Sequence, residues 1–386
     1  MASVQLGVGA TIEANSPFEW YLFFAAHRAF TIDETSAKFL DGDGDSVTFK
    51  GSELDTDKGT VTGVLIEDKQ GRLVVDISGL SLDFSTVRPL YETPTDAGEF
   101  AIKDYLLPYL LTDANTITGT EAGDELFVSF SEGNDVINGL AGDDLFRGSA
   151  GNNRLNGGSG RDELAYHTGW FAAAESGVRL NAELGTAKNP WGGNDKFKGF
   201  EIYSGSQRND VFTGSKSNEH FVLLNGKDVL DGKGGFDTVD YSRDAVTFHA
   251  GVGSGSKGVV VNLQSGKATD GWGSADKLKN IEAAIGTTYD DVFTGTAAKN
   301  TFTGLGGADA FIFAKKFGAD TITDFGVAEN DIVDFSAFKT IKSFDDLALV
   351  MKQDGADVVI AIKGSGALTL QDVTLDSLTT AHFELG

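Results

Sequence analysis

The amino-acid sequence predicts an all-β protein, in which a parallel β-roll with β-rich excursions follows a small β-rich N-terminal module. Two observations carry this prediction. A nine-residue pattern, G-G-x-G-x-D-x-U-x with U a large apolar residue, recurs at residues 139–147, 157–165 and 232–240. The chain also holds 50 glycines, which recur in phase with aspartate and apolar residues. That phasing indicates ordered tight turns, because glycine adopts backbone conformations that other residues avoid.

Residues 1–118 lack the repeat and form the predicted N-terminal module. The apolar runs at 61–66 and 73–77 flank a polar turn, which predicts a β-hairpin. The acidic run DGDGD at 41–45 resembles the first half of an EF-hand loop, but Ser52 stands where that loop needs a bidentate glutamate. A solvated turn is the favoured interpretation of this run, and a bound ion is the alternative.

The β-roll is predicted for residues 119–323, in arrays at 119–165, 205–240 and 286–323. In each unit, six residues make a glycine-rich turn and three make a short strand whose apolar residue faces inward. Two units complete one coil, so each unit stacks on the second unit after it. The inward residues, at the eighth position, are Leu126, Ile137, Phe146, Leu155, Leu164, Phe212, Phe221, Leu230, Val239, Phe293, Phe302 and Phe311.

The sixth position of the unit is acidic in most copies and supplies the candidate metal ligands. Repeats of this pattern form parallel β-helices that bind Ca²⁺. Calcium is a hard ion that takes six to eight oxygen ligands, and glycine lets a turn direct backbone carbonyls at it. The spacing therefore predicts several Ca²⁺ ions held between stacked turns. The candidate residues are Asp124, Asp135, Asp144, Asp162, Asp210, Asp228, Asp237, Asp291, Asp309 and Asp320, with Gly139, Gly142, Gly157, Gly160, Gly232, Gly304 and Gly307.

The stacking rule also predicts which side chains share an ion. The strong pairs are Asp124 with Asp144, Asp144 with Asp162, Asp210 with Asp228, and Asp291 with Asp309. Weaker or empty positions are expected where asparagine lacks the charge or glutamate is one methylene longer. These are Asp135 with Asn153, Glu219 with Asp237, and Asn300 with Asp320. Polar turns without metal are the alternative, which many units in phase disfavour.

A larger duplication contains the arrays. The segment that begins at Trp191 aligns with the segment that begins at Trp272, and Asp195 with Asp276 and Glu201 with Glu282 coincide at the same offset. The two copies include excursions, at 166–204 and 241–285, which are expected to leave the roll and pack alongside it. Alternating residues at 178–181 and 259–263 predict strands there. The matching tryptophans are interpreted as packing anchors, with glycan stacking as the alternative.

Residues 324–386 begin with the segment DFGVAENDIVDFSAF. The repeats and this ending together resemble RTX proteins, the calcium-binding proteins exported by type I secretion. The ending itself resembles the C-terminal region of serralysin-type proteases and the R-modules of alginate epimerases. The resemblance spans residues 119–386. It implies an export signal in the C-terminal region, a type I secretion exporter as partner, and a location outside or on the surface of a Gram-negative cell. A β-rich cap on the roll is a second expectation for the same residues.

Composition limits the classes of partner. The chain has 31 basic and 57 acidic residues, a net charge of −26, which disfavours nucleic acid and anionic membranes. There is no cysteine, so disulfide and thiolate sites are excluded. The apolar run at 18–26 is too short for a membrane span and is not preceded by the basic flank of a signal peptide.

The chain is expected not to be an enzyme, because the sequence contains neither H-E-x-x-H nor G-x-S-x-G and its five histidines are scattered. The leading hypothesis is a secreted calcium-binding protein that acts in surface adhesion, in biofilm or matrix, or in ordered surface assembly. Extracellular polysaccharide and further copies of the chain are the partners considered. One alternative is a polysaccharide-active enzyme with its site in the N-terminal module. Another is a structural protein that forms a lattice or filament.

Overall fold

The computed structural model describes residues 2–6, 29–32, 36–40, 46–52, 60–67, 73–83, 115–119, 121–127, 133–167, 176–245 and 255–386. These residues are almost entirely β-structure, which confirms the predicted fold class. In this part of the chain, no helix is long and apolar enough to cross a membrane. The chain divides into unit 1, residues 1–171 with 185–201, and unit 2, residues 172–184 with 202–386.

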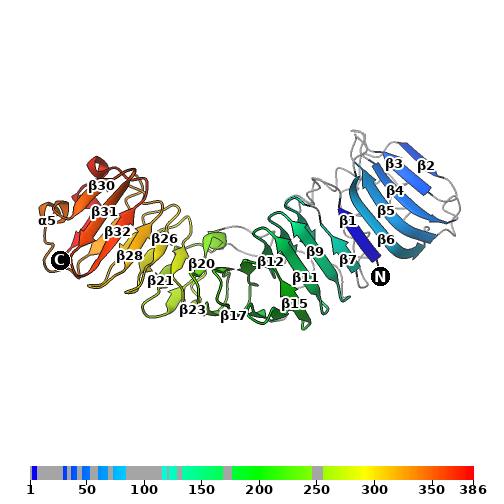
Figure 1. Ribbon diagram of the computed structural model, residues 1–386, viewed down its shortest axis with the longest axis horizontal. Coiled ribbons are helices and arrows are strands. Elements are labelled where there is room, and N and C mark those ends of the chain that lie inside the picture. The colour runs from blue at the N-terminus through cyan, green and yellow to red at the C-terminus, as the bar shows by residue number, and fades with distance from the viewer. Residues whose placement is uncertain are drawn as a thin grey trace. The chain divides into compact units, whose positions relative to one another are not determined.

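Unit 1 begins with an antiparallel sheet (Figure 1). Its strands are β1 (Ala2–Leu6), β2 (Ala29–Ile32), β3 (Ser36–Leu40), β4 (Ser46–Ser52), β5 (Thr60–Glu67) and β6 (Leu73–Asp83). They pair in the order β2–β3–β4–β5–β6–β1. The β5–β6 pair is the hairpin that the sequence predicts. The acidic run at 41–45 and the apolar run at 18–26 lie outside the described residues.

The roll of unit 1 consists of two stacks of parallel strands. Strand β7 (Asn115–Thr118) pairs with β1 of the N-terminal sheet, so the roll begins a few residues before the predicted boundary at 119. One stack has the order β7–β9–β11–β15 and the other has the order β8–β10–β12. Successive strands alternate between the stacks, which confirms the predicted coil of two units. The strands are β8 (Glu125–Phe127), β9 (Val136–Ala141), β10 (Leu145–Arg147), β11 (Arg154–Ser159), β12 (Glu163–Ala165), β14 (Thr186–Lys188) and β15 (Asn194–Lys198).

Unit 2 repeats this construction. One stack runs β16–β18–β20–β24–β26–β28, and the other contains β13–β17–β19–β23 and β21–β25–β27. Its strands are β13 (Arg179–Asn181), β16 (Ile202–Ser204), β17 (Val211–Thr213), β18 (His220–Val222), β19 (Val229–Asp231), β20 (Thr238–Asp240), β21 (Val260–Asn262), β22 (Lys267–Thr269), β23 (Ala275–Lys279), β24 (Ala283–Ile285), β25 (Val292–Thr294), β26 (Thr301–Thr303), β27 (Ala310–Ile312) and β28 (Ala319–Ile322).

The predicted packing of the excursions alongside the roll is wrong. The predicted strands at 178–181 and 259–263 exist as β13 and β21, but they pair within the roll. In unit 1, β15 of the first excursion lies parallel to β11. In unit 2, β23 lies parallel to β19, and β22 links it to β21 through antiparallel pairs. The excursions therefore contribute further coils, because their backbone groups find partners in the existing stacks.

A cap closes both stacks of unit 2. Strand β32 pairs with β28, and β33 pairs with β29, which itself pairs with β27. The cap elements are β29 (Ile332–Phe335), α5 (Phe344–Ala348), β30 (Met351–Asp354), β31 (Asp357–Ile362), β32 (Gly366–Leu370) and β33 (Phe383–Leu385). Phe313, Phe317, Phe335 and Phe338 are all buried and in ring contact beneath it. This agrees with the expected β-rich cap.

The core of each roll is a column of apolar side chains between the two stacks. Every inward residue predicted at the eighth position is at most 4% exposed. Phe293 stacks on Phe311 with ring centroids 5.4 Å apart, and Phe302 contacts both rings.

Candidate calcium sites

A ladder of hydrogen bonds links the sixth-position residues of successive coils. In unit 1 the backbone N–H of Asp124 donates to Oδ1 of Asp144 (2.8 Å), and the N–H of Asp144 donates to Oδ1 of Asp162 (2.9 Å). In unit 2 the same bonds join Asp210 to Asp228 and Asp291 to Asp309, both at 2.8 Å. The structure thus brings together all four predicted strong pairs. Each bond uses one carboxylate oxygen and leaves the other oxygen for a different partner.

The second oxygen, Oδ2, has no hydrogen-bond partner among the described residues in six of these aspartates. They are Asp144, Asp162, Asp228, Asp237, Asp309 and Asp320, and each is at most 2% exposed. A buried carboxylate oxygen without a partner is strongly unfavourable unless a cation or donor compensates it. The orphaned oxygens therefore mark positions where a cation fits.

Glycines make room for the ion beside these oxygens. A Cβ built at Gly139 would overlap both Oδ2 of Asp144 and the carbonyl oxygen of Gly157, from the next coil. At Gly119 it would lie 2.6 Å from the carbonyl oxygen of Gly139 and 2.7 Å from Oδ2 of Asp124. Gly304 crowds Oδ2 of Asp309 in the same way. Carboxylate and carbonyl oxygens therefore converge at Gly119 and Gly139, and such an all-oxygen donor set suits Ca²⁺.

The other predicted glycines shape the turns. Gly142, Gly160 and Gly307 have φ angles of +107°, +139° and +116°, in a region that residues with a Cβ rarely adopt. At the second position the backbone is left-handed even where the residue is not glycine, as at Leu140 (+84°) and Leu305 (+73°). The units that begin at Gly139, Gly157, Gly232 and Gly304 share this left-handed second position, whereas Ser206, Ser215, Thr287 and Thr296, which follow the first glycine in other units, do not have a positive φ.

The electrostatics of the ladder favour a cation at neutral pH. Burial raises the pKa of Asp144 to about 7, with a further contribution from Asp162 and Asp124. Burial and the adjacent Asp210 raise the pKa of Asp228 to about 9, and burial with Asp331 raises that of Asp309 to about 8. Without an ion, these carboxyls resist ionisation because they are desolvated and face one another.

The donor set is dominated by the backbone. Within the described part of the chain, no group of three or more histidine, cysteine, aspartate or glutamate side chains gathers as a metal cluster. The carboxylates stand in pairs along the ladder, so most of the oxygens around an ion must be turn carbonyls.

The positions predicted to be weaker carry competing donors. Asn153 accepts from the N–H of Asp135, while its Nδ2 donates to the carbonyls of Ala150 (3.2 Å) and Ser149 (3.4 Å). Nδ2 of Asn300 donates to the carbonyl of Glu282 (3.1 Å). The carboxylate of Glu219 accepts from both the hydroxyl and the N–H of Ser215. Amide or hydroxyl donors thus engage oxygens that an ion would need at these positions, and the lower affinity of these sites stays a prediction.

Two residues of the predicted strong pairs are more fully satisfied than the sequence suggests. Both oxygens of Asp210 accept hydrogen bonds from Ser206, at 2.7 and 2.8 Å. Thr287 donates to Asp291 in the same way, at 2.6 and 3.0 Å. In these pairs the oxygens left without a partner belong to Asp228 and Asp309. Ser206 and Thr287 directly follow Gly205 and Gly286, and their hydroxyls are the signal that sequence reasoning overlooked.

The ladder extends to carboxylates that the sequence did not assign to it. The N–H of Asn153 donates to Asp195 (2.8 Å), that of Asp228 to Asp276 (2.9 Å) and that of Asp309 to Asp331 (2.9 Å). Glu201 and Glu282 accept equivalent bonds at the opposite edge of the coil. The signal available for four of these residues was their coincidence in the two copies of the duplication.

Comparison with known proteins identifies the repeat. Residues 131–164, 204–239 and 285–313 match the model of the RTX calcium-binding nonapeptide repeat, in four copies. A solved structure of an extracellular lipase from Serratia marcescens is similar at 17% sequence identity and a TM-score of 0.23, over 79% of this chain. This chain spans 51% of that lipase. Among curated proteins none matches the sequence. The arrays of this chain are RTX calcium-binding nonapeptide repeats, which bind several Ca²⁺ ions.

Proposed function

We propose that this chain is a secreted, non-enzymatic calcium-binding protein that folds on Ca²⁺ outside the cell and acts in adhesion, in biofilm or matrix, or in ordered assembly at the cell surface. The observation that carries the calcium-gated step is the set of buried carboxylate oxygens, present in both units, that have no hydrogen-bond partner among the residues described. Such a set disfavours the folded chain until cations arrive.

The gating follows from calcium concentration. Where Ca²⁺ is scarce, as in the cytosol, the carboxylates repel one another and the roll is unfavourable. Extracellular calcium modules have dissociation constants of about 10⁻⁴ to 10⁻³ M, so their sites fill only outside the cell. Binding free energy then becomes folding free energy. A type I secretion exporter of a Gram-negative bacterium is the proposed partner before folding, since it would receive the chain unfolded.

Circular dichroism during a calcium titration tests this step. We expect the β-structure signal of the full chain to appear over the high-micromolar to millimolar range and to be lost again in EDTA. Magnesium is the matched control, because it prefers near-ideal octahedral geometry and gives up water reluctantly. A β-signal that stays unchanged in EDTA would contradict calcium-gated folding.

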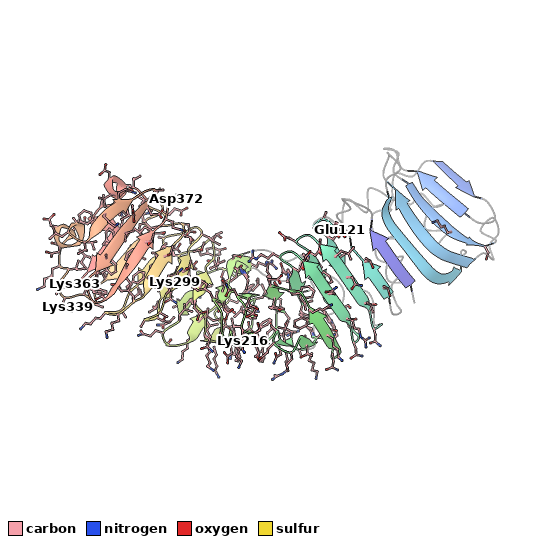
Figure 2. The ribbon with its side chains drawn as sticks, in the orientation of Figure 1. Glu121, Lys216, Lys299, Lys339, Lys363 and Asp372 are labelled. Atoms are coloured by element: carbon pink, nitrogen blue, oxygen red, sulfur yellow. The ribbon has the colours of Figure 1, made fainter. Side chains whose placement is uncertain are left out.

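The surface of the roll supports a role in binding an extended partner. In unit 1 the exposed residues Asn134, Asn152 and Asn194 form a row. The N–H of Asn152 donates to the side chain of Asn134 (2.7 Å), and the N–H of Asn194 donates to that of Asn152 (2.9 Å). Strands in a stack are about 4.7–4.9 Å apart, so such rows present polar groups at a regular spacing. Polar side chains such as Glu121 and Lys216 also project from the rolls (Figure 2). A regular polar row suits a polysaccharide or a second copy of the chain.

Two assays separate the proposed role from its alternatives. On a glycan array with calcium present, we expect binding to acidic or neutral polysaccharide without any change in the glycan chain length. Turnover of a bound glycan would overturn the non-enzymatic proposal and indicate a polysaccharide-active enzyme. Electron microscopy of the calcium-loaded protein addresses assembly, since periodic arrays would indicate a lattice-forming structural protein.

A further inference from the structure

We propose that Glu201 and Glu282 are calcium ligands, each completing an ion site where a duplicated excursion joins the ladder of the roll. The repeat model matches residues 131–164, 204–239 and 285–313, and both glutamates lie outside these ranges. The inference rests on calcium binding by the repeats and does not depend on the adhesive role.

Each glutamate occupies the place of a sixth-position aspartate one coil further on. The backbone N–H of Asp162 donates to Oε2 of Glu201 (3.0 Å), and that of Asp237 donates to Oε2 of Glu282 (2.9 Å). The same type of bond joins Asp144 to Asp162 within the first array. In return, the N–H of Glu201 donates to the carbonyl of Asp162 and that of Glu282 to the carbonyl of Asp237, both at 3.1 Å. Each glutamate is therefore fixed in register with the last aspartate of an array.

An orphaned carboxylate oxygen faces each of these positions. Asp162 and Asp237 are both 0% exposed, and neither Oδ2 has a hydrogen-bond partner within the described residues. These atoms are equivalent to Oδ2 of Asp144, which faces the next coil inside the array. Because Asp162 and Asp237 each end an array, the oxygens that complete their sites must come from the excursions.

The excursions supply a carbonyl oxygen at the required place. A Cβ built at Gly157 would overlap the carbonyl oxygen of Gly199 and lie 2.5 Å from Oδ2 of Asp162. A Cβ built at Gly232 would overlap the carbonyl oxygen of Asn280 and lie 2.5 Å from Oδ2 of Asp237. This is the arrangement found at Gly139, where the oxygens belong to Asp144 and Gly157. The pocket at the excursion therefore has the same oxygens as a repeat site, with glutamate as the second acid.

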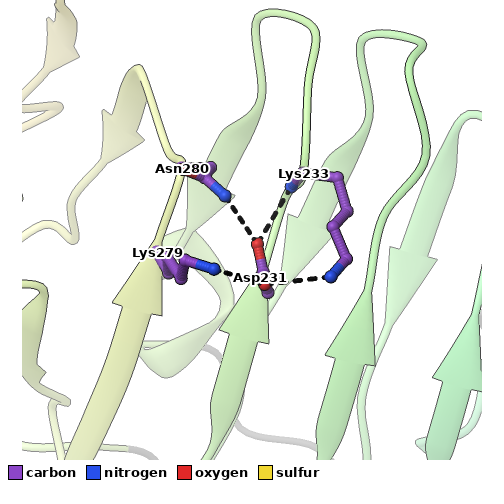
Figure 3. A network of polar contacts seen from close by, with 4 residues as sticks. All are labelled: Asp231, Lys233, Lys279 and Asn280. Atoms are coloured by element: carbon purple, nitrogen blue, oxygen red, sulfur yellow. Dashed lines mark hydrogen bonds and ion pairs between the residues drawn. The ribbon is translucent and has the colours of Figure 1, made fainter.

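The turns that carry these carbonyls are held in a defined shape. Gly199 and Asn280 are both left-handed, with φ angles of +66° and +52°. In unit 2 the side chain of Asn280 donates to Asp231 (2.8 Å), which also accepts from Lys279 (3.1 Å) and Lys233 (3.2 Å), as Figure 3 shows. The side chain of Asn280 is thus tied to the neighbouring coil, and its carbonyl is left for the ion.

At the other edge of the same coil, the carboxylates of Asp195 and Asp276 accept hydrogen bonds from protein donors on both oxygens. Oδ2 of Asp195 accepts a hydrogen bond from the buried hydroxyl of Tyr166 (2.8 Å), and Oδ2 of Asp276 accepts one from Tyr241 (2.9 Å). Each Oδ1 accepts from the ladder, from Asn153 and Asp228 respectively. A tyrosine hydroxyl therefore occupies the place of the cation there. Within the part of the chain that the structure describes, Oδ2 of Asp162 and of Asp237 has no such donor, which is why we place the ions at the glutamate edge.

The test is calcium stoichiometry of the full chain by equilibrium dialysis, with Glu201→Gln, Glu282→Gln and the double variant. Glutamine keeps an oxygen that accepts the N–H of Asp162 or Asp237, so the ladder persists while the charge is lost. We expect each single variant to bind one ion fewer than the parent and the double variant to bind two fewer. Glu183→Gln, at an exposed turn residue, is the matched control and should leave the number unchanged.

Asp144→Asn, inside the first array, distinguishes failure of the inference from failure of calcium binding itself. If Asp144→Asn loses ions while the double glutamine variant loses none, the inference is overturned and the repeats still bind calcium. If the parent chain binds no calcium, calcium binding by the repeats is itself contradicted, and the inference falls with it. Crystals of the parent chain give an answer that needs no variant. Anomalous scattering from calcium beside Asp162 and Asp237 is expected, and peaks confined to the arrays would contradict the proposal.

Discussion

At the scale of single residues, the first-position glycine decides whether a turn can hold an ion. A Cβ at Gly139 would fill the space between Oδ2 of Asp144 and the carbonyl of Gly157. Gly139→Ala should therefore abolish the calcium dependence of that turn and lower stability by roughly 1–3 kcal/mol through overpacking. Calcium titration followed by thermal unfolding measures both effects. Gly234→Ala is the control, since no atom lies within 4 Å of a Cβ there. An equal loss of stability in both variants would contradict the role of Gly139 in making room for the ion.

The second position of the turn carries a strain that can be relieved. Leu305 has a left-handed backbone, with φ of +73°, and its side chain is 38% exposed, so it loses little contact on truncation. A left-handed residue with a Cβ is less favourable than glycine by roughly 1–2 kcal/mol. Leu305→Gly should raise the free energy of unfolding by about 1 kcal/mol, net of the greater freedom of glycine in the unfolded chain. Leu184→Gly is the control, because Leu184 is an exposed turn leucine without a positive φ. Chemical denaturation should show no increase in the free energy of unfolding for this variant.

The sequence predicts the ion-binding residues only where the turn follows the repeat. The sixth-position aspartates and first-position glycines were predictable because glycine and acid recur together with a fixed period. Glu201 and Glu282 were not, since their turns lack that spacing and only the folded ladder brings them to Asp162 and Asp237. The hydrogen bonds from Ser206 to Asp210 and from Thr287 to Asp291 involve a hydroxyl residue directly after the first glycine, a position that the nine-residue pattern leaves out of account.

At the scale of elements, strands follow from sequence more readily than their neighbours do. Each apolar eighth position predicts a strand, and the period of two units per coil predicts its partner. In the excursions that period is lost, so the parallel pairing of β15 with β11 and of β23 with β19 depends on backbone groups that must find partners. The duplication shows that both excursions have the same structure, but it does not show which strand each one meets.

At the scale of elements, the hydrogen bond between Tyr166 and Asp195 joins the end of the first array to the excursion that follows it. Tyr166→Phe removes the closer donor to Oδ2 of Asp195 and leaves this buried oxygen with only the longer bond from Nδ2 of Asn189 (3.3 Å). The expected loss is about 1–3 kcal/mol in saturating calcium, with the number of bound ions unchanged. Thermal unfolding and equilibrium dialysis together check the two parts. Tyr289→Phe, at a tyrosine that is 37% exposed, is the control and should leave both quantities unchanged.

At the scale of the whole molecule, the ladder links folding to two competing cations, calcium and the proton. Burial raises the pKa of Asp144, Asp228 and Asp309 to about 7, 9 and 8, from an ordinary value of 3.8. In the ion-free protein the folded state therefore binds more protons than the unfolded state. Its protonated carboxyls contribute stability that is fully present below pH 3.8, the unfolded value, and is lost as pH rises through the folded values.

Calcium reverses that dependence, because the ion requires the ionised carboxylates that protons remove. In EDTA we expect the β-structure signal that remains at about pH 6 to fall as pH rises to about 9, the window set by the raised pKa values. In saturating calcium the signal should hold or rise over the same window, so that the stabilisation due to calcium grows with pH. Circular dichroism at a series of pH values, with and without calcium, measures this difference. Parallel curves in the two conditions would mean that the buried carboxyls do not exchange protons for calcium on folding.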